Sequence, residues 1–450
     1  MQRLIVKNFG PLKEVDIPIK DLTILIGPNG SGKSLLGKLA YFFHQLPDYF
    51  FGYVHSPEWA DIQADKFLEE FLERIIPRLF RNAFGSKEFL RPDTEILFSF
   101  DGGESFLICS ASEEYLLSVQ EVSPQLLEGI QAFLFVPKEE LRQFSGSVLW
   151  DRVYDIFHIS SGGRQHSRYF SPQRGGRIQL EKALLENWFM GAQESRDVYG
   201  EQRKSLLDDY WMTAYYPDYQ RDRTIFEQED WDLFFSQERK LRSQSAEGLH
   251  DLDLLVQSIA SLRDMIGGDF VVSKTGQEFI ITTSGVRIPM QRASSGQHEV
   301  TGMWPGLLQS VLNKQRGFFF VEEPEAHLYP KAQQQVVNAL ALTLNAQRGN
   351  QLLVTTHSPY VLAAFDNLIQ ANEIAAKSET NAQHIQHFVP KDLWIPFDKV
   401  SAFFIDEMGH SQEMKDFENN SIGGEPLDNG ASQISSIYDQ LLEFKYPLES

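Results

Sequence analysis

The feature of this sequence that most constrains its fold is a glycine-rich segment near the N-terminus. Residues 27–34 read Gly-Pro-Asn-Gly-Ser-Gly-Lys-Ser and fill every fixed position of the pattern G-x-x-x-x-G-K-[ST]. The apolar run 22–26 before them predicts a strand, and apolar residues at helical spacing follow at positions 35, 36, 39 and 42. A strand, a glycine-rich loop and a helix in this order form a site for the phosphates of a nucleotide.

The residue types in this loop indicate how it would hold ATP and Mg²⁺. Glycines let backbone N–H groups curve around an anion, and the following helix adds the positive end of its dipole. Lys33 is expected to reach the β- and γ-phosphates, and the hydroxyl of Ser34 to ligate Mg²⁺. The nucleotide-binding residues predicted from this loop are Asn29, Gly30, Ser31, Gly32, Lys33 and Ser34.

The composition indicates a large folded protein rather than a disordered chain or a small disulfide-stapled module. Of the 450 residues 42% are hydrophobic, and 34 Phe, 15 Tyr and 7 Trp supply ample material for a core. The single cysteine, Cys109, cannot form an internal disulfide, which points to a reducing compartment. The N-terminus lacks a signal-peptide pattern, and no apolar run approaches the about 20 residues that span a bilayer. We therefore expect a cytoplasmic protein.

The charge balance limits the partners. The chain has 41 basic and 62 acidic side chains, a net charge of −21, so it repels phosphate backbones on average and a nucleic-acid contact would need a local basic patch. The last fifty residues hold ten Asp and Glu against Lys415 and Lys445. This segment is either a solvated acidic surface or a docking surface for a basic partner.

The hydrophobic pattern favours an α/β fold. Strands are predicted at 4–6, 22–26, 94–100, 105–110, 132–136, 278–282, 286–290, 318–321, 352–355 and 400–405, and helices at 59–84, 298–313, from 330 onward and at 434–444. A polar turn at 8–11 separates the first two strands. Residues 160–178 lose apolar character and predict a mobile loop.

These elements predict a split ATPase core with an insertion. We expect residues 1–178 to form its N-terminal part with an antiparallel β lobe, and residues 266–370 its C-terminal part. Residues 179–265 would form a helical insertion between them, and residues 371–450 an acidic C-terminal extension.

Two adjacent carboxylates end the apolar run at 318–321. Burying the charged carboxylates of Glu322 and Glu323 at the end of a strand costs free energy unless a cation lies nearby. Because side chains alternate along a strand, the two cannot share one environment. We expect Glu322 to anchor Mg²⁺ and Glu323 to accept a proton from the water that attacks the γ-phosphorus. The alternative is ordinary surface charge.

A histidine ends the next predicted strand. His357 follows the run 352–355, 34 residues after Glu323. A neutral imidazole there would hydrogen-bond the γ-phosphate or orient the attacking water, whereas the alternative is a structural histidine. The predicted catalytic residues are Lys33, Glu323 and His357, and the predicted metal ligands are Ser34 and Glu322.

A second phosphate cradle is predicted at residues 293–297, Ala-Ser-Ser-Gly-Gln. They open a helix with small residues and free N–H groups but supply no lysine. One chain does not need two cradles for one γ-phosphate, which suggests that this one serves a nucleotide bound to another subunit. An ordinary helix N-cap is the alternative.

Together these motifs resemble the ABC-type ATPases of the SMC/RecF class, and in particular the ATPase part of the OLD (overcoming lysogenization defect) proteins and the AAA-type ATPase subunits of bacterial anti-phage systems. The segments that carry the resemblance are, in chain order, 4–11, 27–34, 293–297, 321–328 and 355–360, and the likeness extends over roughly 1–50, 90–145 and 268–366. It implies a P-loop ABC-type ATPase head with an antiparallel β lobe and a helical insertion.

The resemblance also implies an assembly. Two ATP molecules would lie between head-to-tail protomers, with Ser294 and Gly296 of one protomer capping the γ-phosphate held by Lys33 of the other. Asn8 matches the segment near the adenine and ribose. Residues 325–328 match the segment that crosses the dimer interface. Lys138 or Arg142 would sense phosphate where the chain returns to the site.

The sequence departs from the family pattern in three respects. The signature reads Ala-Ser-Ser-Gly-Gln rather than Leu-Ser-Gly-Gly-Gln, so contacts in trans would be weaker. Glu322 stands where Asp is more usual. Only 93 residues follow His357 and they hold no Asp-x-Asp pair, so we expect no TOPRIM nuclease domain.

The loop at 160–178 carries four arginines and no acidic residue between positions 161 and 177. With Tyr169 and Phe170 among them, they could grip phosphates and stack on bases, or they could lie in a solvated flexible loop. The four candidates for a nucleic-acid or acidic-partner contact are Arg164, Arg168, Arg174 and Arg177.

The leading interpretation is a cytoplasmic Mg²⁺-dependent ATPase that assembles around ATP as a homodimer or larger homo-oligomer. It would act as a sensor or scaffold that controls a separate effector, a nuclease, in anti-phage defence. The second interpretation is an SMC/RecF-like DNA-repair ATPase that clamps DNA, against which the net charge argues. A transporter ATPase with a membrane partner is the third.

Overall fold

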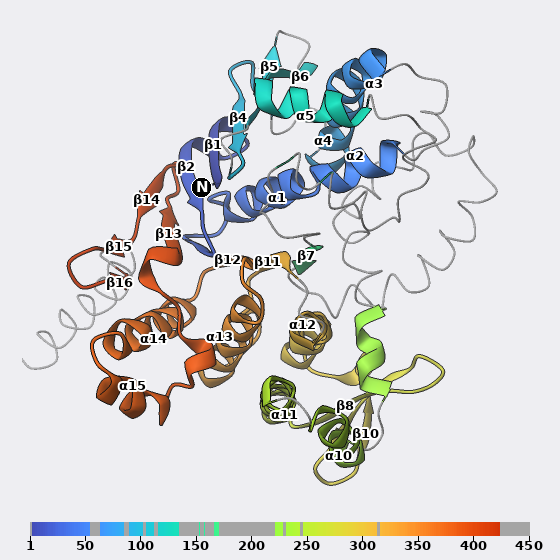
Figure 1. Cartoon of the computed structure of the whole chain (residues 1–450), viewed down its shortest axis with the longest axis vertical. Coiled ribbons are helices and arrows are strands. Elements are labelled where there is room, and N and C mark those ends of the chain that lie inside the picture. The colour runs from blue at the N-terminus through green and yellow to red at the C-terminus, as the bar shows by residue number, and fades with distance from the viewer. Residues whose placement is uncertain are drawn as a thin grey trace, which may run out of the picture.

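The structure is a computed structural model, and it describes residues 2–54, 64–84, 90–101, 105–111, 116–134, 153, 157, 166–170, 221–227, 231–243, 246–312 and 316–423. Two large sheets lie one above the other in Figure 1, with a helix between them and further helices below. This mixed arrangement confirms the predicted α/β fold and the antiparallel β lobe. Residues 135–136, 179–220 and 434–444, for which a strand and helices are predicted, lie outside the described residues.

The central sheet has six strands in the order β14–β13–β3–β12–β11–β7. Its strands are β3 (Leu22–Ile26), β7 (His166–Phe170), β11 (Gly317–Glu322), β12 (Gln351–Thr356), β13 (Val400–Ile405) and β14 (Ser411–Glu413). All neighbours pair in parallel except β13 and β14. Every residue of β3, β11 and β12 is buried, as is typical of parallel strands covered on both faces, and this explains their continuous apolar runs.

The second sheet is antiparallel, in the order β2–β1–β4–β5–β6. It consists of β1 (Gln2–Phe9), β2 (Leu12–Ile19), β4 (Glu95–Ser99), β5 (Ser105–Ala111) and β6 (Leu116–Val122). The predicted hairpin of 94–100 with 105–110 is confirmed. The sequence analysis missed β2, whose alternating buried Val15, Ile17 and Ile19 give the period-two pattern of an edge strand.

Helix α1 (Lys33–His44) lies between the two sheets. On one side Gly37 packs against Phe320 of β11, and on the other side Phe43 stacks on Phe98 of β4 with ring centroids 4.8 Å apart. His44 stacks on Phe318 at 3.7 Å, and burial lowers the pKa of its imidazole to about 4. The neutral ring therefore belongs to the core that joins the sheets.

Further helices cover the outer end of the antiparallel sheet. They are α2 (Leu46–Val54), α3 (Ala64–Glu70), the π-helical turn η2 (Phe71–Ile75), α4 (Ile76–Phe84) and α5 (Pro124–Leu134). The predicted helix at 59–84 is confirmed from residue 64 onward, with the π turn inside it. The predicted strand at 132–136 is wrong for its described residues: Ile130, Phe133 and Leu134 are buried at helical spacing in α5.

A lobe with its own three-stranded sheet precedes the signature segment. It contains the short helix η5 (Arg223–Glu227), α10 (Trp231–Arg242), α11 (Ala246–Ile266), β8 (Gly268–Val272), β9 (Glu278–Thr282) and β10 (Arg287–Pro289), and it leads into α12 (Ser295–Leu312). The predicted hairpin of 278–282 with 286–290 is confirmed, as is the helix at 298–313, which begins earlier. The sequence analysis missed β8, which pairs with β9.

The face of the central sheet opposite α1 is covered by helices that follow its strands (Figure 1). They are α13 (Pro330–Asn345), α14 (Pro359–Ala375) and α15 (Glu379–Gln386), followed by the turns η7 (Lys391–Leu393) and η8 (Phe397–Lys399) and the short pair β15 (Lys415–Asp416) and β16 (Ser421–Ile422). The helix from Pro330 and the strand at 400–405 are confirmed. Both α13 and α14 begin with proline, which is pre-organised for a first turn.

The predicted mobile loop at 160–178 is wrong for its described part. Residues 166–170 form β7, the edge strand that pairs in parallel with β11. Its last three side chains, Arg168, Tyr169 and Phe170, are buried. The buried arginine is paired with Asp222, a residue far along the chain, so no local pattern indicates the strand.

We expect Gly37→Ala to destabilise the protein, although alanine raises helix propensity by about 1 kcal/mol. A Cβ atom at Gly37 would lie 2.1 Å from Cε2 of Phe320, so α1 would have to move off β11. Overpacking of this kind lowers the free energy of unfolding by about 1–3 kcal/mol, which urea unfolding of the variant would measure. The control is Gly423→Ala, whose Cβ atom meets nothing within 4 Å. If both variants were as stable as the wild type, the close contact between Gly37 and Phe320 would be contradicted.

Candidate nucleotide-binding site

The predicted site residues meet at one edge of the central sheet. Because β3, β12 and β11 are adjacent and parallel, their carboxyl ends lie at the same edge. The glycine-rich loop follows β3, Glu322 and Glu323 end β11, and His357 follows β12. Ligands of open α/β sheets bind outside this edge.

The glycine-rich loop depends on its glycines at two positions. Gly27 has a φ of 154°, and a Cβ atom there would lie 2.1 Å from the carbonyl oxygen of Ile405. Gly32 has a φ of 100° and packs against Leu12, which brings the β1–β2 turn onto the loop. The loop therefore forms a narrow backbone cradle that a side chain would fill.

Lys33 is the first residue of α1 and is almost fully buried. Its Nζ donates to the carbonyl oxygen of Pro28 at 2.7 Å and to Oγ of Ser31 at 3.4 Å. Burial lowers the pKa of Lys33 to about 8, while the negative charges of Glu323 and Glu325 oppose this shift. These carboxylates therefore act on the ammonium across the site.

Glu322 and Glu323 occupy different environments, as the alternation along a strand predicts. Glu322 is 2% exposed, and its Oε1 accepts a hydrogen bond from the hydroxyl of Tyr169 at 2.6 Å and lies 3.7 Å from Nζ of Lys38. Glu323 has a positive φ of 44°, and 35% of its side chain is exposed. Its Oε1 lies 3.2 Å from Nε2 of His357. The structure thus joins the two predicted catalytic side chains directly.

Glu325 fixes the end of β12, whereas the sequence analysis placed it only in the segment 325–328 at the dimer interface. Its Oε1 accepts hydrogen bonds from Oγ1 of Thr356 and from the backbone N–H of His357, both at 2.7 Å. Its Oε2 is buried and has no hydrogen-bond partner among the residues that the structure describes. The signal in the sequence is weak, because Glu325 is only one more acidic residue after the Glu-Glu pair.

The signature segment begins α12. Gln297 N–H donates to Oγ of Ser294, and Ser294 N–H donates to Oε1 of Gln297, which is the reciprocal pattern of a capping box. A Cβ atom at Gly296 would lie 2.8 Å from the carbonyl oxygen of His327. Within the described residues, neither Ser294 nor Gly296 hydrogen-bonds to the glycine-rich loop, so the structure does not join the two cradles in one chain.

Asn8 lies at the end of β1, in the turn that contacts the loop. Its φ is 52°, and its Nδ2 donates to Oδ2 of Asp93 at 2.8 Å. Oγ1 of Thr94 donates to the carbonyl oxygen of Asn8 at 2.6 Å, so the turn is tied to the neighbouring strand. The structure places Asn8 near the site but does not test its role.

The predicted basic patch is wrong for Arg168. Its guanidinium is 3% exposed, forms an ion pair with Asp222, and donates to the carbonyl oxygen of Gly306 at 3.3 Å. A side chain held in this way is not available to a phosphate backbone. The other basic candidates, Arg164, Arg174, Arg177, Lys138 and Arg142, lie outside the described residues.

The donor set fits a Mg²⁺–nucleotide complex. Among the described residues, no three His, Cys, Asp or Glu side chains form a cluster that could hold a metal ion. Proteins usually hold Mg²⁺ through one or two side chains, waters and substrate phosphates. The backbone cradle, the ammonium of Lys33 and the orphaned Oε2 of Glu325 supply the polar surroundings that such a complex needs. No helix within the described residues is long and apolar enough to cross a membrane.

The loop, the carboxylate pair and the sheet order define a P-loop ATPase domain. Residues 131–363 match the family model described as "AAA domain, putative AbiEii toxin, Type IV TA system", and residues 1–133 match one described as "AAA ATPase domain". The first match spans more than half of the chain, so the chain belongs to that family. ATP hydrolysis is the general activity of such domains.

Solved structures with some likeness include three heads of SMC proteins. The SmcHead bound to the C-winged helix domain of ScpA is 16% identical, with a TM-score of 0.36 over 80% of this chain and 90% of that chain. The SMC head domain from Thermotoga maritima is 14% identical, with a TM-score of 0.31 over the same shares. The Smc head with an extended coiled coil bound to the C-terminal domain of ScpA, derived from Pyrococcus furiosus, is 12% identical, with a TM-score of 0.35 over 97% and 100%. Scores this low add nothing to the assignment.

The lowered pKa of Lys33 predicts a pH dependence of stability. Between pH about 8 and 10.5 the unfolded chain binds a proton at this lysine that the folded protein does not, so this contribution to the free energy of unfolding rises with pH across that window. Urea unfolding of the wild type and of Lys33→Met at several pH values from about 8 to 10.5 checks this. The wild type is expected to gain stability relative to the variant. Parallel pH profiles of the two proteins would contradict it.

Proposed function

We propose that this protein is a cytoplasmic Mg²⁺-dependent ATPase that assembles head-to-tail around ATP and controls a separate effector, a nuclease, in anti-phage defence. The observation that carries the proposal is the meeting of the glycine-rich loop, the carboxylate pair and His357 at one sheet edge. For the chain as a whole we retain the division into 1–178, 179–265, 266–370 and 371–450.

The nucleotide would be bound by the loop from Asn29 to Ser34, with Lys33 on the β- and γ-phosphates. Ser34 and Glu322 would hold Mg²⁺, whose charge neutralises the negative charge that develops during phosphoryl transfer. Desolvation of Lys33 strengthens its attraction to phosphate once the ammonium is charged, because the surrounding medium screens it less. Asn8 would lie along the adenine and ribose.

Glu323 is the best-placed general base. Its carboxylate is partly exposed, so a water molecule can reach it, and His357 lies at hydrogen-bond distance on its other side. Glu325 holds the backbone of His357, which fixes the distance between His357 and Glu323. Glu323 would take the proton of the attacking water, and His357 would orient that water or contact the γ-phosphate.

The head-to-tail assembly is supported by the signature segment. Ser294 is exposed, and α12 presents its N-terminus and the positive end of its dipole outward. His327 and Leu328 lie directly against Gly296, so the two segments that would meet a partner lie side by side. A second protomer would then bring its own bound ATP to Ser294 and Gly296.

The defence role draws on the family and on the charge. The matched family model names a putative toxin of a type IV TA system, which is compatible with a role in restricting phage. The net charge of −21 and the burial of Arg168 weigh against DNA clamping as the main activity.

We expect Glu323→Gln to retain ATP binding and to lower turnover at least about a hundredfold, because it removes the base but keeps the shape of the side chain. The solution mass of wild type and variant, with and without ATP and Mg²⁺, should show an ATP-dependent dimer or larger assembly that accumulates in the variant. Normal turnover in Glu323→Gln would remove this residue from its role. If both proteins were monomers under every condition, the proposed ATP-dependent assembly would be wrong.

A mixing experiment tests whether the site is shared between protomers. Ser294→Asp keeps the N-cap of α12, since aspartate caps as well as serine, but places a negative charge where the partner's γ-phosphate would lie. Lys33→Met disables the loop instead. Each variant alone should be inactive, and their mixture should recover part of the wild-type turnover, because mixed dimers contain one site with an intact loop and an intact signature.

The matched control is a mixture in which both proteins carry Lys33→Met, one of them with Ser294→Asp as well, where no site is intact. No recovery in the first mixture, at concentrations where the wild type is a dimer, would mean that Ser294 does not act on a partner's nucleotide.

A further inference from the structure

Strand β7 occupies a position next to the carboxylate that would hold the metal. It pairs in parallel with β11, with Tyr169 opposite Phe320 and Phe170 opposite Val321. Tyr169 therefore lies two positions before Glu322 along the sheet. Its ring stacks on that of Phe320, with centroids 5.2 Å apart and 26° between the ring planes, which fixes the orientation of the tyrosine ring.

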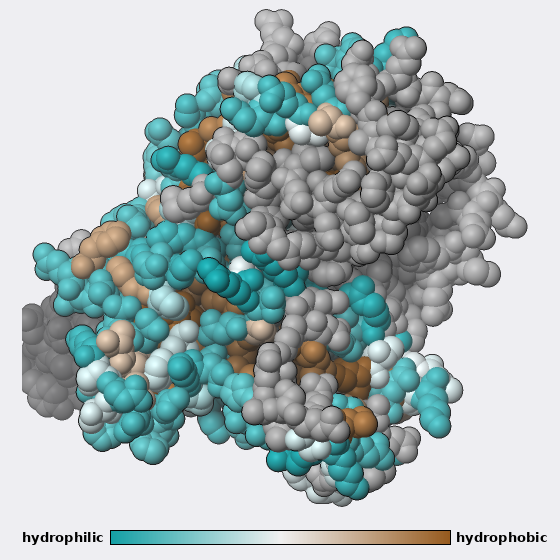
Figure 2. All heavy atoms as spheres, viewed as in Figure 1, coloured by the Kyte–Doolittle hydropathy of each residue, from teal (hydrophilic) through white to brown (hydrophobic). Residues whose placement is uncertain are grey.

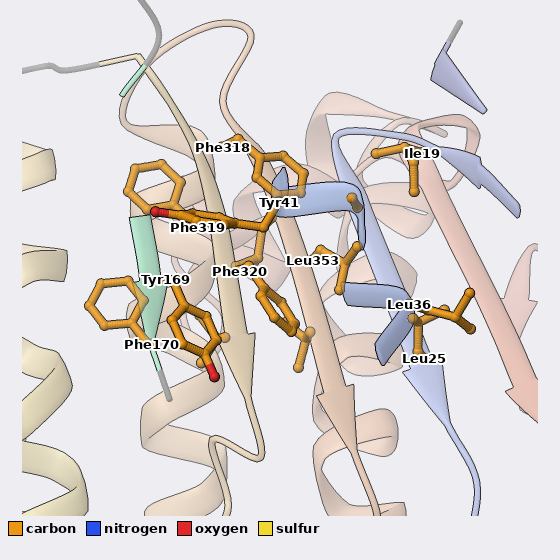
Figure 3. Packing of buried hydrophobic residues seen from close by; sticks show 14 of the residues in the cluster. Ile19, Leu25, Leu36, Tyr41, Tyr169, Phe170, Phe318, Phe319, Phe320 and Leu353 are labelled. Carbon is orange, nitrogen blue, oxygen red and sulfur yellow. The ribbon is translucent and has the colours of Figure 1, made fainter. Parts of the chain in front are cut away.

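The hydroxyl of Tyr169 reaches Glu322 itself. In Figure 3 the ring of Tyr169 lies beside Phe320, and its oxygen points along β11 toward the carboxyl end of that strand. The hydroxyl donates to Oε1 of Glu322 at 2.6 Å, and both side chains are at most 3% exposed. A hydrogen bond to a carboxylate is short and strong, especially where water is excluded.

A second group competes for the same oxygen. Nζ of Lys38, on α1, lies 3.7 Å from Oε1 of Glu322, an ion pair at longer range than the tyrosine hydrogen bond. If the hydroxyl of Tyr169 were lost, the carboxylate would be drawn toward the lysine. A carboxylate paired with an ammonium is a poorer ligand for a cation.

The other face of β7 is attached to α12. Side chains alternate along a strand, so Arg168 and Phe170 lie opposite Tyr169. Arg168 donates to the carbonyl oxygen of Gly306, and a Cβ atom at Gly306 would lie 2.9 Å from Cε1 of Phe170. Strand β7, whose Tyr169 hydrogen-bonds Glu322, is thus packed on α12, the helix that begins at the signature residues Ser294 and Gly296.

We propose that Tyr169 is a positioning residue of the Mg²⁺–ATP site: its hydroxyl holds Glu322 in the orientation that binds the metal and keeps it from pairing more closely with Lys38. This inference rests on the proposed role of Glu322 as a metal ligand. It adds a residue that touches neither nucleotide nor metal and that comes from a segment without any nucleotide-binding motif.

The test is Tyr169→Phe, which keeps the stacked ring and removes only the donor. Calorimetry or fluorescence would measure the affinity for a non-hydrolysable ATP analogue across a range of Mg²⁺ concentrations. The half-saturating Mg²⁺ concentration should rise about tenfold, the usual effect of losing a partner of a metal ligand. Affinity for the analogue without Mg²⁺ should stay unchanged.

The matched control is Tyr41→Phe. Tyr41, on α1, lies beside Tyr169 with ring centroids 5.8 Å apart, and its hydroxyl donates to the carbonyl oxygen of Ser167 at 3.5 Å. It should leave the Mg²⁺ dependence unchanged. Equal Mg²⁺ dependence of Tyr169→Phe and wild type, whatever the thermal stability, would overturn the proposal and leave Tyr169 a packing residue.

Two further variants separate the possible failures. Glu322→Gln should itself raise the half-saturating Mg²⁺ concentration. If it does not, Glu322 is not a metal ligand, and the inference about Tyr169 fails with it. If only Tyr169→Phe is silent, the proposed function stands and the inference alone falls. Adding Lys38→Met to Tyr169→Phe should bring the half-saturating Mg²⁺ concentration back toward wild type. Absence of this rescue would overturn the competition between Tyr169 and Lys38.

Discussion

The structure depends on the parallel pairing of β3 with β12 and of β12 with β11. This pairing brings together residues that are about three hundred positions apart in the chain, and it aligns the three strand ends at which the loop, the carboxylates and the histidine begin. Each strand is wholly buried, so the register is enforced by the burial of every side chain. A polar residue that follows the last buried residue of any of these three strands therefore lies at the same edge of the sheet.

Helix α1 converts this edge into a rigid site. It begins at Lys33, and its remaining length is packed between two sheets, with Gly37 against Phe320 and Phe43 against Phe98. The antiparallel sheet holds α1 from above, and its β1–β2 turn also supports Gly32 of the loop. The position of the lysine is therefore set by contacts on both sides of the helix.

Much of this arrangement was predictable because its signals are local. The glycine pattern, the apolar runs that end in Glu322 and His357, and the proline at the start of α13 each report a single element, and the structure agrees with them. The failures at β7 and Glu325 share a cause. Strand β7 contains an arginine that is neutralised by Asp222, and Tyr169 and Glu325 act through partners on other elements, so their sequence neighbourhoods look like a polar loop or surface charge. The strand predicted at 132–136 failed because a short apolar run fits a helix equally well.

Strand β7 has a consequence beyond the site, because it is the edge strand beside β11. Three phenylalanines in succession, a valine and little charge give β11 the composition of segments that pair between molecules when their backbone groups are exposed. With β7 in place, those backbone groups are already hydrogen-bonded within the chain. During synthesis β7 leaves the ribosome before β11, so the strand that covers this edge is available when the aggregation-prone segment appears. The same short strand whose Tyr169 hydrogen-bonds Glu322 therefore also covers the edge of β11 against pairing with another molecule.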